Sequence, residues 1–199
     1  MTARTARVLL VGAAFLAGLT LCFGAVLMLT GRGSAPVAQQ IAAIGGPFTL
    51  TDQNGRTVTD QDFKGRPFLV FFGFTHCPDV CPTTLFEVSE ILRTLGPDAD
   101  RVRAVFITVD PERDTPEVMK DYLSSFDSRL SGLTGDPAAV AAVAKAYRVY
   151  FKKVPLDQGG YTMDHTAIVY LMDKNGRFVS PFNLKRGIAA AADDLRRYL

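Results

Sequence analysis

Two cysteines stand where an apolar, strand-like run gives way to a helical pattern. The run extends from Pro67 to Phe74, and Cys77 and Cys81 follow within one short segment. From Cys81 to Leu95, apolar residues recur with the period of an α-helix. A buried strand that leads directly into a helix begins a β-α unit. We therefore expect both sulfur atoms to lie at the N-terminal end of that helix.

Strand and helix signals alternate along the rest of the chain. The turn Asn54-Gly55 predicts a β-hairpin. Thr115-Pro116 and Asp136-Pro137 each combine an N-cap residue with a proline in the first turn, which predicts a helix start. The expected strands are Phe48–Thr51, Arg56–Thr59, Phe68–Phe74, Val102–Val109, Ala167–Met172 and Arg177–Phe182, and Tyr147–Val154 is expected to be extended. The expected helices are Cys81–Leu95, Thr115–Phe126, Asp136–Ala146 and Gly187–Leu199. This order predicts an α/β fold with a central mixed sheet flanked by helices.

The N-terminal segment has a different composition. Val8–Leu29 contains no charged residue, and at about 22 residues it is long enough to cross a bilayer as a helix. Arg4 and Arg7 precede it and only Arg32 follows closely, so the positive-inside rule places the N-terminus in the cytoplasm. A cleaved signal peptide is the alternative, but its apolar core is normally about 7–15 residues, and the segment after Gly33 offers no clean cleavage site. We therefore expect a retained N-terminal transmembrane helix.

Three regions follow from this pattern. Residues 1–30 are expected to form a cytoplasmic stub and a single anchor, residues 31–46 a flexible linker, and residues 47–199 the folded domain. Too few residues precede the span for a mitochondrial transit peptide, which indicates a bacterial inner-membrane protein with its C-terminal domain in the periplasm. That compartment oxidises thiols, so a metal-binding pair would need a reducing partner. The net charge of +2, with both signs interspersed, gives no basic patch for nucleic acid.

The spacing of the two thiols permits two kinds of chemistry. Thiolate is the reactive and metal-binding form, and a helix N-terminus lowers the pKa of a thiol. Positions i and i+4 share one face of a helix, so Cys77 and Cys81 can point at one ion or close a disulfide. Their three-residue spacer is one residue longer than that of the Cys-x-x-Cys redox motif. Both uses stay open on spacing alone.

His165 is the candidate third ligand. It stands just before the expected strand Ala167–Met172. In thioredoxin-like folds, the loop that enters this strand abuts the cysteine-bearing helix end and commonly holds a cis-proline, yet here the nearest upstream proline is Pro155. Two thiolates and an imidazole suit copper or zinc; sulfur favours Cu(I), and Cu(II) would give a neutral site, so both copper states stay open. Three protein ligands leave an open position, which suits metal transfer.

Four residues near these motifs have simpler interpretations. The side chain of His76 is expected to diverge from the adjacent cysteine and face solvent or a partner. Asp79 is expected to place a negative charge near the helix N-terminus. Asp110 either hydrogen-bonds to a metal ligand, recognises a partner or caps a turn. Met163 is expected to pack in the interior.

Three motifs together resemble those of the Sco/SenC family. They are Phe72–Pro82, Val109–Thr115 and Asp164–Thr166, and the resemblance covers about residues 45 to 199 in order. It implies a thioredoxin-like fold tethered by one membrane helix, with copper held by Cys77, Cys81 and His165. It also implies a role in assembling the binuclear copper site of cytochrome c oxidase.

Two functions fit these expectations. The first is a membrane-tethered copper metallochaperone for the copper-site subunit of the oxidase, served by a copper donor and a thiol reductant that the sequence does not identify. The second is a thiol-disulfide oxidoreductase that uses Cys77 and Cys81 on periplasmic protein thiols without obligatory copper transfer. His165 favours the first, because dithiol exchange needs only two sulfurs. Phe74 argues against a peroxidase, since peroxiredoxins usually carry threonine there, and zinc stays an alternative to copper.

Overall fold

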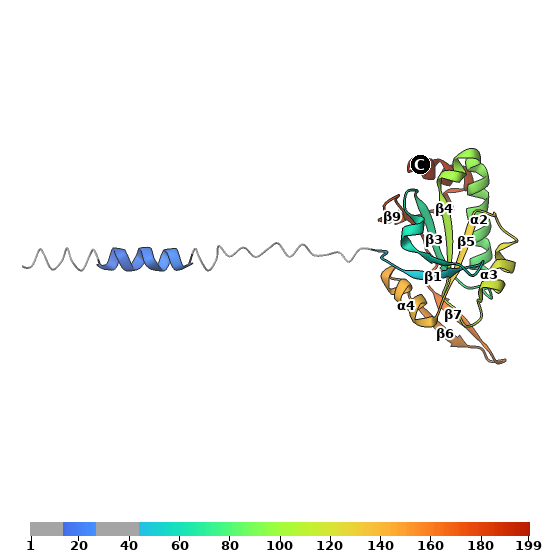
Figure 1. Cartoon of the computed structure of the whole chain (residues 1–199), viewed down its shortest axis with the longest axis horizontal. Helices are drawn as coiled ribbons and strands as arrows, with labels where there is room; N and C mark the ends of the chain where they lie inside the picture. The colour runs from blue at the N-terminus through green and yellow to red at the C-terminus, as the bar shows by residue number, and fades with distance from the viewer. Residues whose placement is uncertain (1–13, 27–43) are drawn as a thin grey trace, which may run out of the picture. The chain divides into compact units, whose positions relative to one another are not determined.

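The computed structural model describes residues 14–26 and 44–199 (Figure 1). The chain divides into two compact units, Met1–Ile41 and Ala42–Leu199. In the first unit, residues 14–26 form a helix with exposed side chains. Within the described residues, none of the helices has the length and apolar character that crossing a bilayer requires. The rest of the expected transmembrane segment and most of the expected linker lie outside the described residues.

The second unit is built on a seven-stranded mixed sheet. Its strands are β1 (Thr49–Asp52), β2 (Thr57–Thr59), β3 (Phe68–Gly73), β4 (Arg103–Thr108), β5 (Leu130–Thr134), β8 (Val169–Met172) and β9 (Phe178–Pro181). They lie side by side in the order β2-β1-β5-β4-β3-β8-β9. Strands β3, β4 and β5 are parallel, and antiparallel pairs extend the sheet on both sides. The mixed sheet and the β1–β2 hairpin expected from the sequence are thereby confirmed.

Helices cover this sheet. They are α2 (Val80–Leu95), α3 (Pro116–Leu123), α4 (Pro137–Ala146) and α5 (Ile188–Arg196), with the short 3₁₀ helices η1 (Asp60–Phe63), η2 (Gly96–Arg101) and η3 (Leu184–Arg186) between elements. Figure 1 shows α4 on one side of the strands and α2 and α3 on the other. The side chains of Thr115 and Asp136 accept hydrogen bonds from amides in the first turns of α3 and α4. Both expected N-caps are confirmed.

The core fixes the place where β3 meets α2. Every residue of β3 is buried, as are the last five residues of β4. Helix α2 packs against α5 and buries a face that includes Leu85, Ile91 and Leu92. Each such side chain contributes about 1.5–3 kcal/mol when it is fully buried. The first turn of α2, which holds Cys81, is therefore anchored by the core.

Strand β5 is absent from the sequence-based expectation, because Ser131 and Gly132 interrupt its apolar run. The structure explains the glycine. A Cβ atom at Gly132 would lie 2.5 Å from Cδ1 of Leu123, so α3 approaches the strand too closely for a side chain. Helix α3 also ends at Leu123 rather than at the expected Phe126, where the backbone turns back and the Phe126 amide donates to the Leu123 carbonyl.

A separate two-stranded sheet carries the candidate histidine. Strands β6 (Phe151–Pro155) and β7 (Tyr161–His165) pair antiparallel, with Phe151 opposite His165. The expected extended segment Tyr147–Val154 is thus a strand only from Phe151 onward. His165 is the last residue of a strand, whereas the sequence predicts a loop there. The strand forms because β7 pairs with β6, and the sequence of β7 lacks the regular alternation of apolar and polar residues that would indicate a strand. Figure 1 shows this hairpin at one end of the domain.

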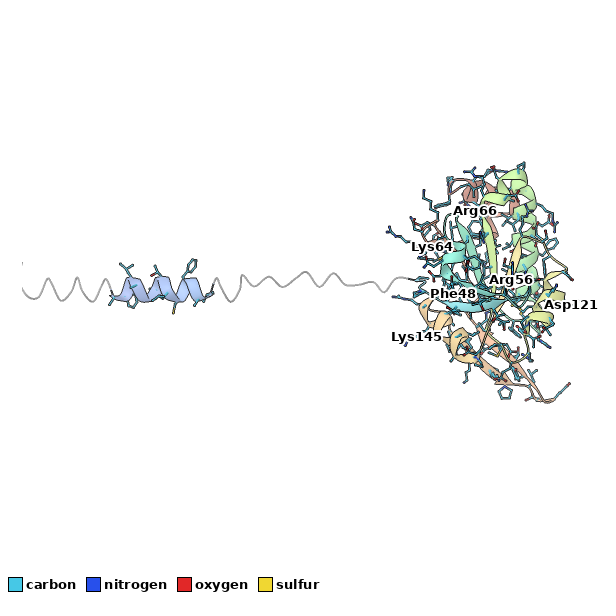
Figure 2. All side chains as sticks on the ribbon, viewed as in Figure 1. Phe48, Arg56, Lys64, Arg66, Asp121 and Lys145 are labelled. Atoms are coloured by element: carbon cyan, nitrogen blue, oxygen red, sulfur yellow. The ribbon has the colours of Figure 1, made fainter. Side chains whose placement is uncertain are left out.

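Charged side chains of the domain lie mostly at its surface. Lys64 and Lys145 are exposed and project outward in Figure 2. Within the described residues, three charged side chains are buried, namely Asp52, Asp110 and Asp114. Asp52 forms an ion pair with Arg56, and β5 and β4 separate its strand from β3, which precedes the cysteines. The other two follow β4 and contribute to the surroundings of the cysteine pair.

Candidate metal centre

Cys77 and Cys81 lie in the turn between β3 and α2. The chain leaves the sheet at Gly73, and the Cys77 amide donates to the carbonyl of Phe74 over 3.2 Å. Helix α2 begins at Val80, so Cys81 is in its first turn while Cys77 precedes the helix. The expectation that both cysteines share one helical face is therefore wrong. The residues meet because the Cys81 backbone N–H donates to the Cys77 sulfur over 3.4 Å, which pairs an amide that a helix N-terminus otherwise leaves without a partner.

Cys81 is packed tightly against the end of β3. Its side chain is fully buried, whereas Cys77 is half-buried. A Cβ atom at Gly73 would lie 2.7 Å from the Cys81 sulfur and 2.6 Å from the ring of Phe106, so only glycine leaves room for the thiol. Burial disfavours the thiolate and raises the pKa of Cys81 far above its ordinary value, although a backbone hydrogen bond from Phe74 opposes the shift. Without metal, Cys81 is a neutral thiol at neutral pH.

His165 presents its Nε2 atom to the same sulfur. Nε2 lies 3.7 Å from Sγ of Cys81, and Nδ1 lies 3.2 Å from the carbonyl oxygen of Thr166. A carbonyl only accepts hydrogen bonds, so the proton is assigned to Nδ1 and Nε2 keeps a free lone pair. Burial lowers the pKa of His165, with the Thr166 carbonyl opposing the shift, and this favours the neutral form of the imidazole. Edge-on contacts with the rings of Phe71 and Phe74 fix its orientation.

Three donor atoms thus converge at one point. The two sulfur atoms and a ring nitrogen of His165 all lie within 4.8 Å of one another. Thiolates and imidazole are soft or borderline donors, and such a set fits copper or zinc. The group provides three ligands, and an ion held there would keep a position open for an incoming donor.

Asp114 organises the loop before Cys77, and the sequence-based reasoning did not single it out. Its buried carboxylate accepts hydrogen bonds from the Thr75 amide over 3.0 Å and from the hydroxyls of Thr75 and Thr108, each over 2.6 Å. It thereby ties the cysteine loop to the end of β4. In sequence, Asp114 lies among polar residues directly before the N-cap Thr115, so nothing in the local pattern indicates burial.

The expectations for His76, Asp79 and Met163 agree with the structure. The side chain of His76 is 53% exposed and contacts the Thr75 hydroxyl, outside the three-donor group. Asp79 occupies the N-cap position of α2, without a side-chain hydrogen bond to the helix amides. Met163 is buried.

Asp110 bonds to residues around the site. Its buried carboxylate forms an ion pair with Arg113 and accepts a hydrogen bond from the Tyr161 hydroxyl over 2.9 Å. These partners connect the loop after β4 to the strand that carries His165, and neither of them is one of the three converging donors.

The fold and the site define a thioredoxin-like protein in which a cysteine pair after a central strand meets a distant histidine. A model of the SCO1/SenC family matches residues 36–199, which is most of the sequence. The chain therefore belongs to the SCO1/SenC family.

Solved structures of related proteins have the same architecture. Copper-bound ScoI of Bradyrhizobium japonicum is 69% identical, with a TM-score of 0.77, and the match covers 79% of this chain and 100% of that one. Copper-bound yeast Sco1 is 36% identical, with a TM-score of 0.70, over 79% of this chain and 91% of that one.

Sequence relatives occur in bacteria and mitochondria. An SCO2-like protein of Rickettsia prowazekii is 42% identical over 143 residues, which cover 71% of this chain and 70% of the relative. The human mitochondrial SCO2 homolog is 41% identical over 162 residues, covering 79% of this chain and 61% of the relative. The matched residues thus make up less than two thirds of the length of the human relative.

Proposed function

We propose that this chain is a copper metallochaperone in which Cys77, Cys81 and His165 hold the ion. The observation that carries the proposal is the convergence of two sulfur atoms and one imidazole nitrogen within 4.8 Å. Their softness suits copper, and Cu(I) best. Support also comes from the copper found in the related ScoI and Sco1 structures.

The unequal burial of the ligands suits transfer of the ion. Cys81 is enclosed by the core, while Cys77 is half-buried and lies at the edge of the helix. A donor atom of a recipient would enter the open coordination position and then displace Cys77 or His165 before Cys81, since these two ligands are only half-buried. The copper is cargo in this scheme, and a site with three protein ligands releases it more readily than a closed four-ligand site.

The proposed recipient is the subunit of cytochrome c oxidase that holds the binuclear copper site. Family membership supports this destination. A structural neighbour, BsSco, is described as a member of the Sco family of cytochrome c oxidase assembly proteins, and at 23% identity it shares the fold with this chain. A copper donor and a thiol reductant are further partners, because both cysteines must be reduced before they bind copper.

We further propose that the domain is tethered to a bacterial inner membrane and lies in the periplasm. The support is the uncharged run Val8–Leu29 and the two arginines that precede it. Protease treatment of spheroplasts tests this arrangement. Digestion of the domain in intact spheroplasts supports it, and protection of the domain until lysis contradicts it.

Thiol-disulfide exchange is a second candidate, favoured by one observation. Cys77 is accessible and Cys81 is buried beside it, an arrangement in which one thiol attacks and the other resolves. The two thiols would become the Cys77–Cys81 disulfide, and a disulfide of the target would gain two electrons and two protons and become a dithiol. This reaction does not need His165.

Anaerobic titration of the reduced, full-length chain tests the metal proposal. Cu(I) and Zn²⁺ are each titrated in competition with a chromophoric chelator, for the wild type and for Cys77→Ala and Cys81→Ala. We expect one Cu(I) per chain, held more tightly than Zn²⁺, and a large loss of affinity in both variants. Unchanged affinity in either variant, or a preference for zinc, would overturn the proposal.

A further inference from the structure

The β6–β7 hairpin is attached to the rest of the domain at the loop after β4. Its two strands form a sheet of their own, separate from the seven-stranded sheet. Tyr161, the first residue of β7, contacts the loop through its ring, its hydroxyl and its carbonyl. Lys153 of β6 pairs with Glu112 of the same loop. The strand that begins at Tyr161 ends at His165, so this attachment bears on the placement of the candidate ligand.

Arg113 makes most of these contacts. Its Nη1 atom donates to the Tyr161 carbonyl over 3.0 Å, and its guanidinium carbon lies 3.8 Å from the centre of the Tyr161 ring. Its Nε atom donates to Asp110, whose other carboxylate oxygen accepts from the Tyr161 hydroxyl. One guanidinium thus holds both the backbone and the side chain of the same residue. The Nη2 atom of Arg113 is buried and has no hydrogen-bond partner. The guanidinium is therefore held by two hydrogen bonds, from Nε and Nη1, and by stacking on the Tyr161 ring.

A second path connects Arg113 to the histidine. The guanidinium lies 5.8 Å from the ring of Phe74, and that ring meets the His165 imidazole edge-on at 5.8 Å. Phe74 also precedes the cysteine loop and accepts the hydrogen bond from Cys77. Arg113 therefore contacts the two elements that carry the sulfurs and the imidazole, without being one of the donors.

We propose that Arg113 is a positioning residue that fixes the β6–β7 hairpin and so holds His165 at the distance that copper binding requires. The proposal rests on the proposed function, in which His165 is a copper ligand. Lysine cannot replace arginine here, because a single ammonium cannot donate to Asp110 and to the Tyr161 carbonyl in this geometry while stacking on the Tyr161 ring. Removing a group that orients a ligand typically lowers metal affinity about 10–100-fold.

The first test uses the metal-free, full-length chain. Amide hydrogen exchange is compared in the wild type, Arg113→Gln and Arg113→Lys. Arg129→Gln is the matched control, since Arg129 is 29% exposed, Arg113 is 24% exposed, and Arg129 pairs with Asp127 away from the hairpin. We expect faster exchange in residues 151–165 of both Arg113 variants, with unchanged protection in β3 and β4, and no such change in the control. Unchanged exchange in the hairpin would overturn the proposal.

The second test is a double-mutant cycle with Cu(I). Arg113→Gln should weaken Cu(I) binding about tenfold in the wild-type background and cause no further loss in a His165→Ala background. An equal loss in both backgrounds would overturn the proposal, because Arg113 would then act through the cysteines or through general stability. The exchange experiment contains no copper. It therefore tests the attachment of the hairpin even if the copper-binding proposal itself fails.

Discussion

The Nε2 atom of His165 lies 3.7 Å from the sulfur of Cys81, although 84 positions separate the two residues in the chain. The mixed sheet produces this contact. Strand β8 runs antiparallel to β3 and pairs Val169 with Phe71, so the segment entering β8 lies beside the segment leaving β3. Cys81 follows the segment that leaves β3, and His165 stands at the start of the segment that enters β8.

Replacing His165 with alanine separates the two proposed functions. Loss of a residue that only hydrogen-bonds to a metal ligand typically lowers affinity about 10–100-fold. Because His165 is proposed to bind the ion directly, Cu(I) affinity should fall by more than about 100-fold. Reduction of a model protein disulfide should continue, since both sulfurs are intact. The measurement pairs a competition titration with a thiol-exchange assay. His76→Ala is the control, because that imidazole is exposed and lies outside the donor group. Full copper affinity in His165→Ala would refute the ligand assignment.

Copper affinity is expected to rise with pH. The raised pKa of Cys81 means that the metal-free site holds a proton there between pH 6 and 8, and binding as thiolate must release it. The apparent affinity then gains about tenfold per pH unit for each proton released. Burial lowers the pKa of His165 below its ordinary value, so at pH 7 and above the neutral imidazole is favoured and contributes no proton.

Calorimetry in buffers of different ionisation enthalpy counts these protons. The proton count should be at least one per Cu(I), and it should be the same in His165→Ala despite the weaker binding. A count of zero in the wild type, or a count that drops when His165 is removed, contradicts this assignment of protonation states.

Substituting Gly73 with alanine should damage both stability and binding. The new Cβ atom would lie 2.7 Å from the Cys81 sulfur and 2.6 Å from the Phe106 ring, so one of them must move. Overpacking of this kind typically costs about 1–3 kcal/mol. Urea unfolding and Cu(I) titration measure the two effects. Gly46→Ala is a suitable control, since its Cβ atom would make an ordinary 3.5 Å contact with Ala146. Equal behaviour of the two variants would show that Gly73 leaves more room than the structure indicates.

Asp114→Asn tests the support of the cysteine loop. The carboxylate accepts hydrogen bonds from Thr75 and Thr108, and an amide nitrogen in place of one oxygen cannot accept. Leaving a buried group unpaired costs about 1–3 kcal/mol, so the free energy of unfolding should fall by that amount. Asp136→Asn should be nearly neutral, because asparagine caps a helix as well as aspartate does. A neutral Asp114→Asn would mean that these hydrogen bonds do not hold the loop.

Local signals in the sequence predict much of the fold. The N-caps of α3 and α4 and the Asn54-Gly55 turn each depend on a few neighbouring residues in the chain. The sequence therefore predicts all three correctly. Strand β5 is different. Its glycine is required by the close approach of α3, a contact between distant segments that no local pattern contains.

The three converging side chains of the candidate site could be predicted from the sequence, whereas the residues around them could not. Cys77 and Cys81 are marked by the strand-to-helix junction, and His165 by its position before a strand. Buried Asp114 and the stacked Arg113 lie in a polar stretch that looks exposed in sequence. Their roles follow from bonds to Thr75 and Tyr161, which only the folded chain brings within reach.

X-ray absorption at the copper edge tests whether Cys77, Cys81 and His165 bind the ion together. The reduced, Cu(I)-loaded, full-length chain should show two sulfur neighbours and one imidazole nitrogen, and His165→Ala should lose the nitrogen while keeping both sulfurs. An imidazole contribution that persists without His165, or a copper environment in the wild type without two sulfurs, would rule out this set of ligands.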